Sequence, residues 1–317
     1  MMTEAPPEGT GAQYRHEALL YAGLSEFLDG TTAFIRRAVA RRQPILVVVG
    51  QGKIDLLRKQ LGADADWVEF GDMSEVGANP GRIIAVWRKF VAAHAGSGQL
   101  WGIGEPVYPG RSPMELAECQ LHEALLNVAF EAQTPFWLLC PYDLEALTAD
   151  VIDEAQRTHP FIAQGTARQE SSNFRPVDRA SPFDRPVPPR PRAVASLAFQ
   201  SGDLGRLRAF VLEQARRAGL GETLAEALMV AVNEIASNSI RHGGGHGELH
   251  TWCDGGCLVC EVSDSGHIRS PLAGRLPPPL DATGGGGLWV ANQLCDLLQI
   301  YSSPGGTVIR GWMYVRS

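Results

Sequence analysis

The sequence has few cysteines, no long apolar run and no excess of positive charge. Its six cysteines are scattered over 317 residues, too few for a disulfide framework, so a reducing cytoplasm is the expected location. No apolar run approaches the roughly 20 residues that a membrane span requires. The first residues include Glu4 and Glu8 and lack the apolar stretch of a signal peptide. The net charge of −7 opposes binding to the phosphates of nucleic acid. We therefore expect neither a membrane nor direct nucleic acid as a partner.

The chain is long enough for two domains that each bury a core. Residues 1–13 are polar and are expected to form a flexible N-terminus. Residues 14–170 alternate short apolar runs with segments of helical spacing, which indicates an α/β domain with a mostly parallel sheet. Strands are predicted at 45–49, 100–104 and 136–140, and helices at 25–42, 52–62, 80–95 and 112–132.

A segment rich in proline and arginine follows, FRPVDRASPFDRPVPPRPRAV at 174–194. It contains few residues that form cores, and its prolines favour extended backbone. We therefore predict a semi-rigid, solvated linker over residues 171–194. The alternative is a segment that docks through its arginines.

Residues 195–317 show a different pattern, in which two helices precede alternating strands. Asp254-Gly255-Gly256 joins two of these strands and has the composition of a hairpin turn. Helices segregated against a largely antiparallel sheet predict an α+β two-layer sandwich. The predicted strands are 196–200, 247–253, 257–264, 299–303 and 307–315, and the predicted helices are 203–218, 222–242 and 287–297.

Polar residues and glycines in this second half recur at spacings that suit nucleotide binding. Glu234 and Asn238 lie four residues apart, so a helix directs both side chains the same way. Asp264 stands where a predicted strand ends, two residues before Gly266. The glycines at 284–287 lead into a helix, whose free N–H groups and dipole favour phosphate. Each feature alone is weak evidence, but their order along the chain is specific.

This ordered set resembles the GHKL (Bergerat) ATP-binding domain, in the branch of bacterial anti-sigma-factor serine kinases. The resemblance covers residues 195–317 and implies a Bergerat fold that binds ATP and Mg²⁺. The matching motifs are an N box at Asn233-Glu234 and Asn238, ending in Arg241-His242-Gly243; a G1 box at Asp264 and Gly266; a G2 box at Gly284, Gly285, Gly286, Gly287 and Leu288, followed by Trp289 and Val290; and Gly306-Thr307 at the last strand.

The resemblance implies roles for single residues. Asn238 would hold Mg²⁺ through its amide oxygen, and Glu234 would be the base that takes the proton from an attacking hydroxyl. Asp264 would accept a hydrogen bond from the adenine amino group, supported by Thr307. Phosphoryl transfer needs mainly positioning and charge neutralisation, which such a set supplies. The other expected ATP-binding residues are His242, Gly266, Gly284, Gly285, Gly286, Gly287 and Leu288.

The sequence departs from the family pattern at three places. Ile268 stands where the G1 box has a second glycine, and Gly286 stands where the G2 box often has a basic residue. The lid between the two boxes, residues 267–283, is rich in proline. Its Arg269 and Arg275 either replace the missing charge or lie on the surface. These departures bear on catalysis more than on binding.

Two other patterns have simpler explanations. Cys253, Cys257 and Cys260 have the spacing of an iron–sulfur site, and two nearby histidines also suit zinc, but the cysteines flank a hairpin turn. We expect small buried thiols there. GQGKIDLL at 50–57 follows a strand, but it lacks the glycine spacing of a phosphate-binding loop, and Ile54 replaces the residue that binds Mg²⁺.

The first half resembles the MEDS sensory domain over about residues 14–165. The segments that carry the resemblance are HEALLY at 16–21, residues 104–127, CPYDLEAL at 140–147 and THP at 158–160. The resemblance implies that this domain senses a small organic molecule.

Parallel sheets bind ligands at the C-terminal ends of their strands. Within the MEDS-like half we therefore take four residues near predicted strand ends as a candidate sensory pocket, with capping or buried structural roles as the alternative. These residues are His16, Glu105, Tyr142 and Asp143. His122 and Glu123 are expected to pack or pair within their own helix.

The sequence as a whole predicts a cytoplasmic signalling regulator. Its sensory domain would control an ATP-dependent serine/threonine protein kinase of the anti-sigma-factor type, whose partner is a sigma factor or an anti-sigma-factor antagonist. Histidine autophosphorylation is not expected, because the proline-rich linker cannot form the helical hairpin that carries the histidine in sensor kinases. The alternative is a non-catalytic module that sequesters its partner. The sequence leaves open whether the chain forms a homodimer.

Overall fold

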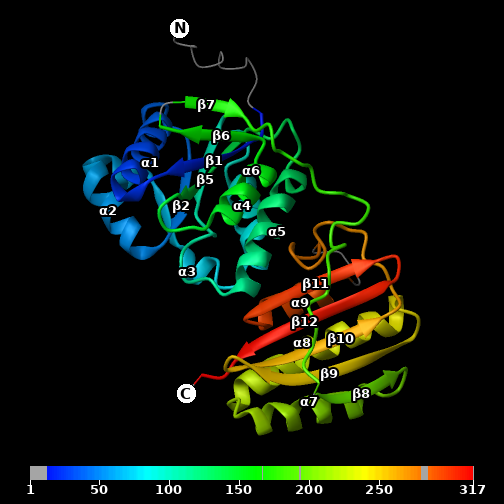
Figure 1. Ribbon diagram of the computed structural model, residues 1–317. Helices are drawn as coiled ribbons and strands as arrows, with labels where there is room; N and C mark the ends of the chain where they lie inside the picture. Colours follow the sequence, from blue (N-terminus) through cyan, green and yellow to red (C-terminus); the bar gives the residue numbers. More distant parts are fainter. Residues whose placement is uncertain (1–12, 166, 193, 280–284, 317) are drawn as a thin grey trace. The chain divides into compact units, whose positions relative to one another are not determined.

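A computed structural model describes residues 13–165, 167–192, 194–279 and 285–316. The chain divides into two compact units, Met1–Val177 and Asp178–Ser317. The predicted fold classes are confirmed, because the first unit contains a mostly parallel sheet with helices and the second an antiparallel sheet with helices (Figure 1). Among the described residues, no helix combines the length and apolar character that crossing a membrane would require.

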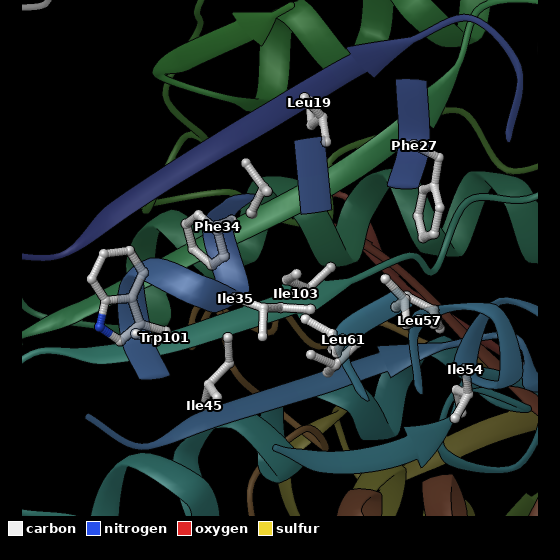
Figure 2. Close-up of a cluster of buried hydrophobic side chains, with 14 of the residues drawn as sticks. Leu19, Phe27, Phe34, Ile35, Ile45, Ile54, Leu57, Leu61, Trp101 and Ile103 are labelled. Carbon is white, nitrogen blue, oxygen red and sulfur yellow. The ribbon is translucent and has the colours of Figure 1, made fainter. Parts of the chain in front are cut away.

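The sheet of the first unit has the strand order β3-β2-β4-β5-β1-β6-β7. Its strands run parallel except β7, which is antiparallel to β6. The central strands are apolar on both faces because helices cover both, and every residue of β2 (Ile45–Val49) is buried. Figure 2 shows part of the resulting core, in which Phe34 and Leu57 from two helices lie with Ile103 from the sheet.

The predicted strands and helices of this unit are present within a few residues of their expected bounds. The predicted elements did not include the strand β1, the short strands β3, β6 and β7, the short helix α3 or the helix α6. The elements are β1 (Arg15–Tyr21), α1 (Gly23–Ala40), β2, α2 (Gln51–Leu61), η1 (Gly62–Trp67), β3 (Glu69–Asp72), α3 (Met73–Val76), η2 (Pro80–Arg82), α4 (Ile83–Ala93), β4 (Leu100–Gly104), α5 (Pro113–Ala129), β5 (Phe136–Asp143), α6 (Ala149–Thr158), β6 (Phe161–Gln164) and β7 (Ala167–Glu170).

The sheet of the second unit has the order β11-β12-β10-β9-β8, and all its neighbouring strands are antiparallel. The hairpin turn is confirmed, since Gly255 and Gly256 join β9 to β10 with φ of +54° and +80°. Helix α8 lies against the sheet, and α7 and α9 both contact α8 (Figure 1). The elements are β8 (Ala195–Gln200), α7 (Leu204–Ala218), α8 (Glu222–His242), β9 (His246–Asp254), β10 (Cys257–Asp264), α9 (Gly287–Leu294), β11 (Leu297–Ser303) and β12 (Gly306–Tyr314).

The proline–arginine segment, residues 178–192, is mostly exposed but is bound to the second unit at particular residues, so it is not the free tether that its composition predicts. Phe183 in this segment is fully buried, and its carbonyl accepts a hydrogen bond from the backbone N–H of Ser302 on the edge strand β11. Pro182 and Phe183 are the buried residues of the segment, and two such residues among many exposed ones give no pattern that indicates a core. The alternative, docking through arginine, describes the structure better.

An ion-pair network fixes the same segment to the sheet. Glu261 of β10 is buried and pairs with the buried Arg310 of β12 at 2.6 Å and with Arg190 of the segment at 3.2 Å. Arg310 also donates to the carbonyl of Pro188. Asp264 of β10 points toward α8, so Glu261, three residues earlier, points to the opposite face. The proline–arginine segment therefore lies on the sheet face that the helices leave uncovered.

Candidate functional site

Helix α8 carries the predicted acid and amide side chains on one side. Its first turn contains the acidic Glu222 and its last turn Arg241 and His242, as the helix dipole favours. Glu234 and Asn238 are half-buried, and no hydrogen bond or ion pair joins Glu234 to another described residue. The amide oxygen of Asn238 accepts a hydrogen bond of 3.3 Å from the exposed Arg241. That oxygen is therefore held only weakly.

The beginning of α9 lies directly against these two side chains. A Cβ placed on Gly287 would be 2.9 Å from Glu234 Oε2 and 3.1 Å from Asn238 Nδ2, so the glycine backbone lies directly against the ends of these two side chains. Gly286 is the N-cap of α9, and Gly285 has φ of +91°. Gly284 lies outside the described residues. The two predicted motifs, far apart in sequence, are thus in contact.

Asp264 ends β10 with both carboxylate oxygens engaged. Ser239 of α8 donates its hydroxyl to Oδ2 at 2.6 Å, and the backbone N–H of Gly266 donates to Oδ1 at 2.7 Å. A Cβ on Gly243 would be 2.4 Å from Asp264 Cγ. These contacts fix the orientation of the carboxylate, while each oxygen keeps a lone pair for one further donor.

The glycines that follow α8 end the helix and contact the loop after β10. The carbonyl of Gly243 accepts hydrogen bonds from the backbone N–H and the hydroxyl of Ser265, at 3.2 and 3.0 Å. Gly244 and Gly245 have positive φ, and a Cβ on Gly244 would be 2.4 Å from the hydroxyl of Ser265. The absence of side chains there lets the chain lie against Asp264 and its neighbour.

A chain of hydroxyl groups fixes the loop after β10. Thr307 pairs with Asp264 in the sheet and donates its hydroxyl to the carbonyl of Gly266 at 2.8 Å. Ser302 lies 2.7 Å from the Thr307 hydroxyl and accepts from the backbone N–H of Ile268 at 2.8 Å. Sequence reasoning named Thr307 but missed Ser302 and Ser239. The cross-strand pairing of Ser302 with Thr307 could have indicated the first of these.

The described part of the lid, residues 267–279, contacts α9. Asn292 of α9 donates to the carbonyl of Gly274 at 2.8 Å, and Leu288 lies close to the same glycine. Arg275 is buried, which corrects the expectation that it is a surface residue, whereas Arg269 is exposed. His242, expected at the nucleotide, is exposed at the end of α8.

The cysteine pattern near the hairpin does not gather metal ligands. Cys257 and Cys260 are buried free thiols, as expected, whereas Cys253 is exposed, which corrects that expectation. Across the described residues, the metal-ligand group that does form lies in the first unit instead.

That group consists of four buried residues from separate elements: His16 of β1, Glu123 of α5, Cys140 of β5 and His159, directly after α6. Glu123 Oε2 lies 3.0 Å from His16 Nε2 and 3.3 Å from His159 Nε2. The expectation that Glu123 pairs within its own helix is therefore wrong. Its signal, a glutamate on the apolar side of an amphipathic helix, was visible in the sequence.

Burial sets the protonation states of this group. It lowers the pKa of His16 to about 4, with the neighbouring His159 as the second cause. Burial also opposes ionisation of Glu123, but the two neighbouring histidines outweigh it and lower the pKa of the carboxyl. Burial and the Glu123 charge raise the pKa of the Cys140 thiol well above its usual range.

The four residues of the predicted sensory pocket are divided between two places. Glu105 follows β4 and accepts hydrogen bonds from the Tyr21 hydroxyl at 2.9 Å and from Lys53 at 2.5 Å. Burial raises the pKa of Glu105, against the opposing effect of Lys53, and the Asp143 charge adds to the rise. Sequence reasoning missed Tyr21 and Lys53.

His16 belongs to the other place, the four-residue group near the middle of the unit. Tyr142 lies beside that group, since its ring meets His159 edge-on with centroids 5.5 Å apart. Asp143 accepts a hydrogen bond from the backbone N–H of Glu145. Glu105 and Asp143 thus lie at the C-terminal ends of the strands, as predicted, while His16 lies near the start of β1.

Comparison with known families agrees with this division of the chain. Residues 15–160 match the family described as MEDS, the methanogen/methylotroph, DcmR sensory domain. Residues 197–311 match the histidine kinase-like ATPase domain. The chain is a MEDS domain followed by a histidine kinase-like ATPase domain. A sensory domain joined to an ATPase domain supports a role as a signalling regulator.

Two solved structures resemble the chain over part of its length. The RsbU and RsbW domains of Rv1364c from Mycobacterium tuberculosis are 17% identical with a TM-score of 0.30, covering 39% of this chain and 32% of that chain. The Acinetobacter baumannii histidine kinase AdeS is 11% identical with a TM-score of 0.24, covering 39% of this chain and 68% of that chain. The chain thus spans about a third of the first structure's length. No curated protein matches it.

The residues of the ATPase domain fit ATP and Mg²⁺ chemically. Asn238 offers an amide oxygen, a ligand type that Mg²⁺ prefers, next to the half-buried carboxylate of Glu234. The glycine backbone at the start of α9 adds N–H donors and the positive end of a helix. Asp264 presents fixed acceptors on the sheet side. The domain therefore offers a fixed acceptor, an amide oxygen that suits a metal ion, and backbone N–H donors at a helix end.

Proposed function

We propose that the ATPase domain binds Mg-ATP and transfers its terminal phosphoryl group to a serine or threonine of a partner protein. The partner is an anti-sigma-factor antagonist, a sigma factor that the domain holds, or both. The MEDS domain controls this activity when it binds a small organic molecule. In this proposal the protein works in the cytoplasm, and the chain can act as a homodimer.

The observation that carries the proposal is the contact of Gly287 with Glu234 and Asn238. It brings the candidate base and the candidate metal ligand to the helix end that would receive the phosphates. Asn238 would hold Mg²⁺ through its amide oxygen, after Arg241 releases it. Mg²⁺ would neutralise charge on the phosphates. Glu234 would accept the proton of the attacking hydroxyl, and Asp264 would accept from the adenine amino group.

A serine or threonine acceptor is favoured over a histidine of the chain itself. The segment before the ATPase domain is extended and bound to its sheet through Phe183 and Arg190. It therefore does not supply the helical hairpin on which sensor kinases present a histidine. An acceptor hydroxyl from a second protein fits the exposed side of α8 better.

Titration of ATP in the presence of Mg²⁺ tests the nucleotide site. Asn238→Ala and Asp264→Asn should each weaken binding about 10- to 100-fold, because a hydrogen bond or metal bond to a charged group is lost. Ser237→Ala is the matched control, since this hydroxyl bonds only to its own helix, at the Asn233 carbonyl. Equal affinity in all variants, or no binding by the unaltered chain, would refute the site.

Transfer of labelled phosphate from ATP to a candidate antagonist protein tests the kinase role. Glu234→Ala should abolish transfer while leaving ATP affinity within a few-fold of the unaltered chain. Glu222→Ala, at the far end of the same helix, should transfer normally. Unchanged transfer by Glu234→Ala would remove this residue from the role of base.

A non-catalytic module is the second candidate function. Two observations favour it: Ile268 replaces a glycine and is fixed to Ser302, and Gly286 leaves the phosphates without a basic side chain. ATP would then act as a conformational ligand, and the domain would sequester its partner. Tight partner binding by a chain that binds ATP but turns none over would select this function.

A further inference from the structure

Four side chains that neither the nucleotide site nor the sensory ends of the strands use converge inside the MEDS domain. The ligand atoms of His16, Glu123, Cys140 and His159 all lie within 4.8 Å of one another, and all four residues are buried. Cys140 Sγ is 3.5 Å from both His16 Nε2 and Glu123 Oε2. The two imidazole rings have centroids 4.0 Å apart.

Hydrogen bonds around the group determine which nitrogen of each ring carries the proton. His159 Nδ1 lies 2.8 Å from the carbonyl of Ala155, which can only accept, so this nitrogen donates. Asn127 donates its amide to the carbonyl of Thr158 at 2.7 Å, so its oxygen faces His16 Nδ1 at 3.1 Å. Both histidines therefore donate through Nδ1 and direct the lone pair of Nε2 into the group.

The centre of the group consequently holds acceptors without matching donors. Two Nε2 lone pairs face the same carboxylate oxygen of Glu123, and only the thiol of Cys140 could supply a proton. His159 Nε2 and Glu123 Oε1 make no hydrogen bond to any described residue. One added proton would satisfy one ring and leave the other facing the carboxylate. Two added protons would place two charges 4.0 Å apart in a buried site.

We propose that the MEDS domain binds one divalent transition-metal ion, zinc by its ligand chemistry, through His16 Nε2, His159 Nε2, Glu123 and Cys140 Sγ. A tetrahedral zinc ion with bonds of about 2.0–2.3 Å separates its ligand atoms by about 3.3–3.7 Å. Four of the six separations between the ligand atoms, 3.0, 3.3, 3.5 and 3.5 Å, need shifts of only a few tenths of an ångström. The other two lie within 4.8 Å, so they need to close by at most about 1 Å.

The surroundings of the site match those of zinc centres in proteins. Ligating histidines usually donate their other nitrogen to a carbonyl or carboxylate that fixes the ring, as Ala155 and Asn127 do here. Four protein ligands and full burial leave no position for water or substrate, which indicates a structural site. The ion would tie β1, α5, β5 and the end of α6 together.

Metal analysis of the full, untagged chain tests the proposal. Purified protein should carry about one zinc ion per chain after gel filtration. After removal of zinc with a chelator, added Co²⁺ should produce the intense visible bands of a tetrahedral ion and a thiolate-to-cobalt band in the near ultraviolet. Cys140→Ser should lose the thiolate band. Glu123→Gln, which keeps the side-chain shape, should weaken cobalt binding about tenfold or more.

Cys119→Ser is the matched control, because Cys119 is a fully buried thiol on α5 that donates to the carbonyl of Pro106. It should retain both the zinc and the cobalt spectrum. Far-ultraviolet circular dichroism verifies that each variant is folded. If Cys140→Ser does not fold, the weakened cobalt binding of Glu123→Gln tests the metal site in its place.

Two results would overturn the metal site. One is a folded, unaltered chain that holds no metal and gives no cobalt bands. The other is a thiolate band that persists in Cys140→Ser. In the first case, nuclear magnetic resonance signals of an imidazolium at His16 or His159 would identify a hydrogen-bonded ion pair in place of the metal.

Discussion

Side chains of the candidate site in the ATPase domain are positioned both by motif residues and by neighbours that were not named among them. Asp264 is the clearest case: Ser239, one residue past the proposed metal ligand Asn238, fixes one carboxylate oxygen, and the backbone N–H of Gly266 fixes the other. A fixed acceptor costs less entropy when adenine binds, because its rotamer is already selected. The positioning hydroxyl of Ser239 is thus as much part of the site as the carboxylate.

Ser239→Ala should weaken ATP binding about 2- to 10-fold, the effect of losing one hydrogen bond of about 0.5–1.5 kcal/mol. The carboxylate of Asp264 stays in place but gains freedom, so the effect should be smaller than that of Asp264→Asn. Calorimetric titration of ATP measures the difference. An affinity equal to that of Ser237→Ala would contradict the positioning role.

Glu105 predicts a pH dependence in the MEDS domain. Because burial raises its pKa in the folded chain, the folded state favours the protonated carboxyl. The stability from this group is complete below the unfolded value of about 4.3 and is lost as pH rises through the raised folded value. Glu105→Gln removes the titration, so the unaltered chain should lose stability relative to this variant as pH rises from about 4.

Urea unfolding of both chains at a series of pH values measures this difference. Lys53, which is partly exposed, pairs with the ionised carboxyl and limits the loss. Glu154→Gln on α6 is the control, and its stability should change with pH in the same way as that of the unaltered chain. If the stability of the unaltered chain rose relative to that of Glu105→Gln as pH increased, the ion pair with Lys53 would outweigh the effect of burial on Glu105.

The pairing of α8 with α9 is the contact between elements on which the site depends. Gly287→Ala should place a methyl group within 3 Å of the Glu234 carboxylate and displace this side chain and that of Asn238, because 2.9 Å is shorter than a Cβ tolerates. ATP affinity should fall about tenfold or more, while stability changes little, since alanine favours the helix. Gly205→Ala is the control: its Cβ meets nothing closer than 3.9 Å, so it should raise stability and leave ATP affinity unchanged. Normal ATP binding by Gly287→Ala would contradict the close approach.

Elements with a strong period or a sharp boundary were predictable from the sequence. β2 is a continuous buried run, and α8 was placed at its observed bounds by its apolar spacing and the glycines on both sides. The nucleotide motifs were predictable because glycine and acid spacing reflect backbone geometry. The metal-ligand group was not, since His16, Glu123, Cys140 and His159 come from four elements whose register only the folded sheet fixes. The short strands β6 and β7 carry too few residues for a period.

The whole chain consists of two units, and the second unit begins earlier along the chain than the sequence composition predicts. Composition placed the start of the second domain at residue 195, after the prolines. The structure assigns residues 178–192 to the second unit, where they cover the sheet face opposite the helices. Proline fixes φ and lowers the entropy that the segment loses when it binds along the sheet. A composition typical of linkers is therefore compatible with a bound, extended segment.

Two fragments of the chain test this boundary. Residues 178–317 should fold alone and bind ATP as the full chain does. Residues 195–317 lack Phe183, whose burial contributes about 3–5 kcal/mol. They also leave Glu261 and Arg310 without Arg190 and the Pro188 carbonyl. Urea unfolding should therefore show the shorter fragment less stable by about 3 kcal/mol or more. Phe183→Ala in the longer fragment should reproduce most of the loss, whereas Val187→Ala, at an exposed position, should not. Equal stability of the two fragments would return residues 178–192 to the role of a linker, because a solvated tether adds nothing to the folded state it precedes.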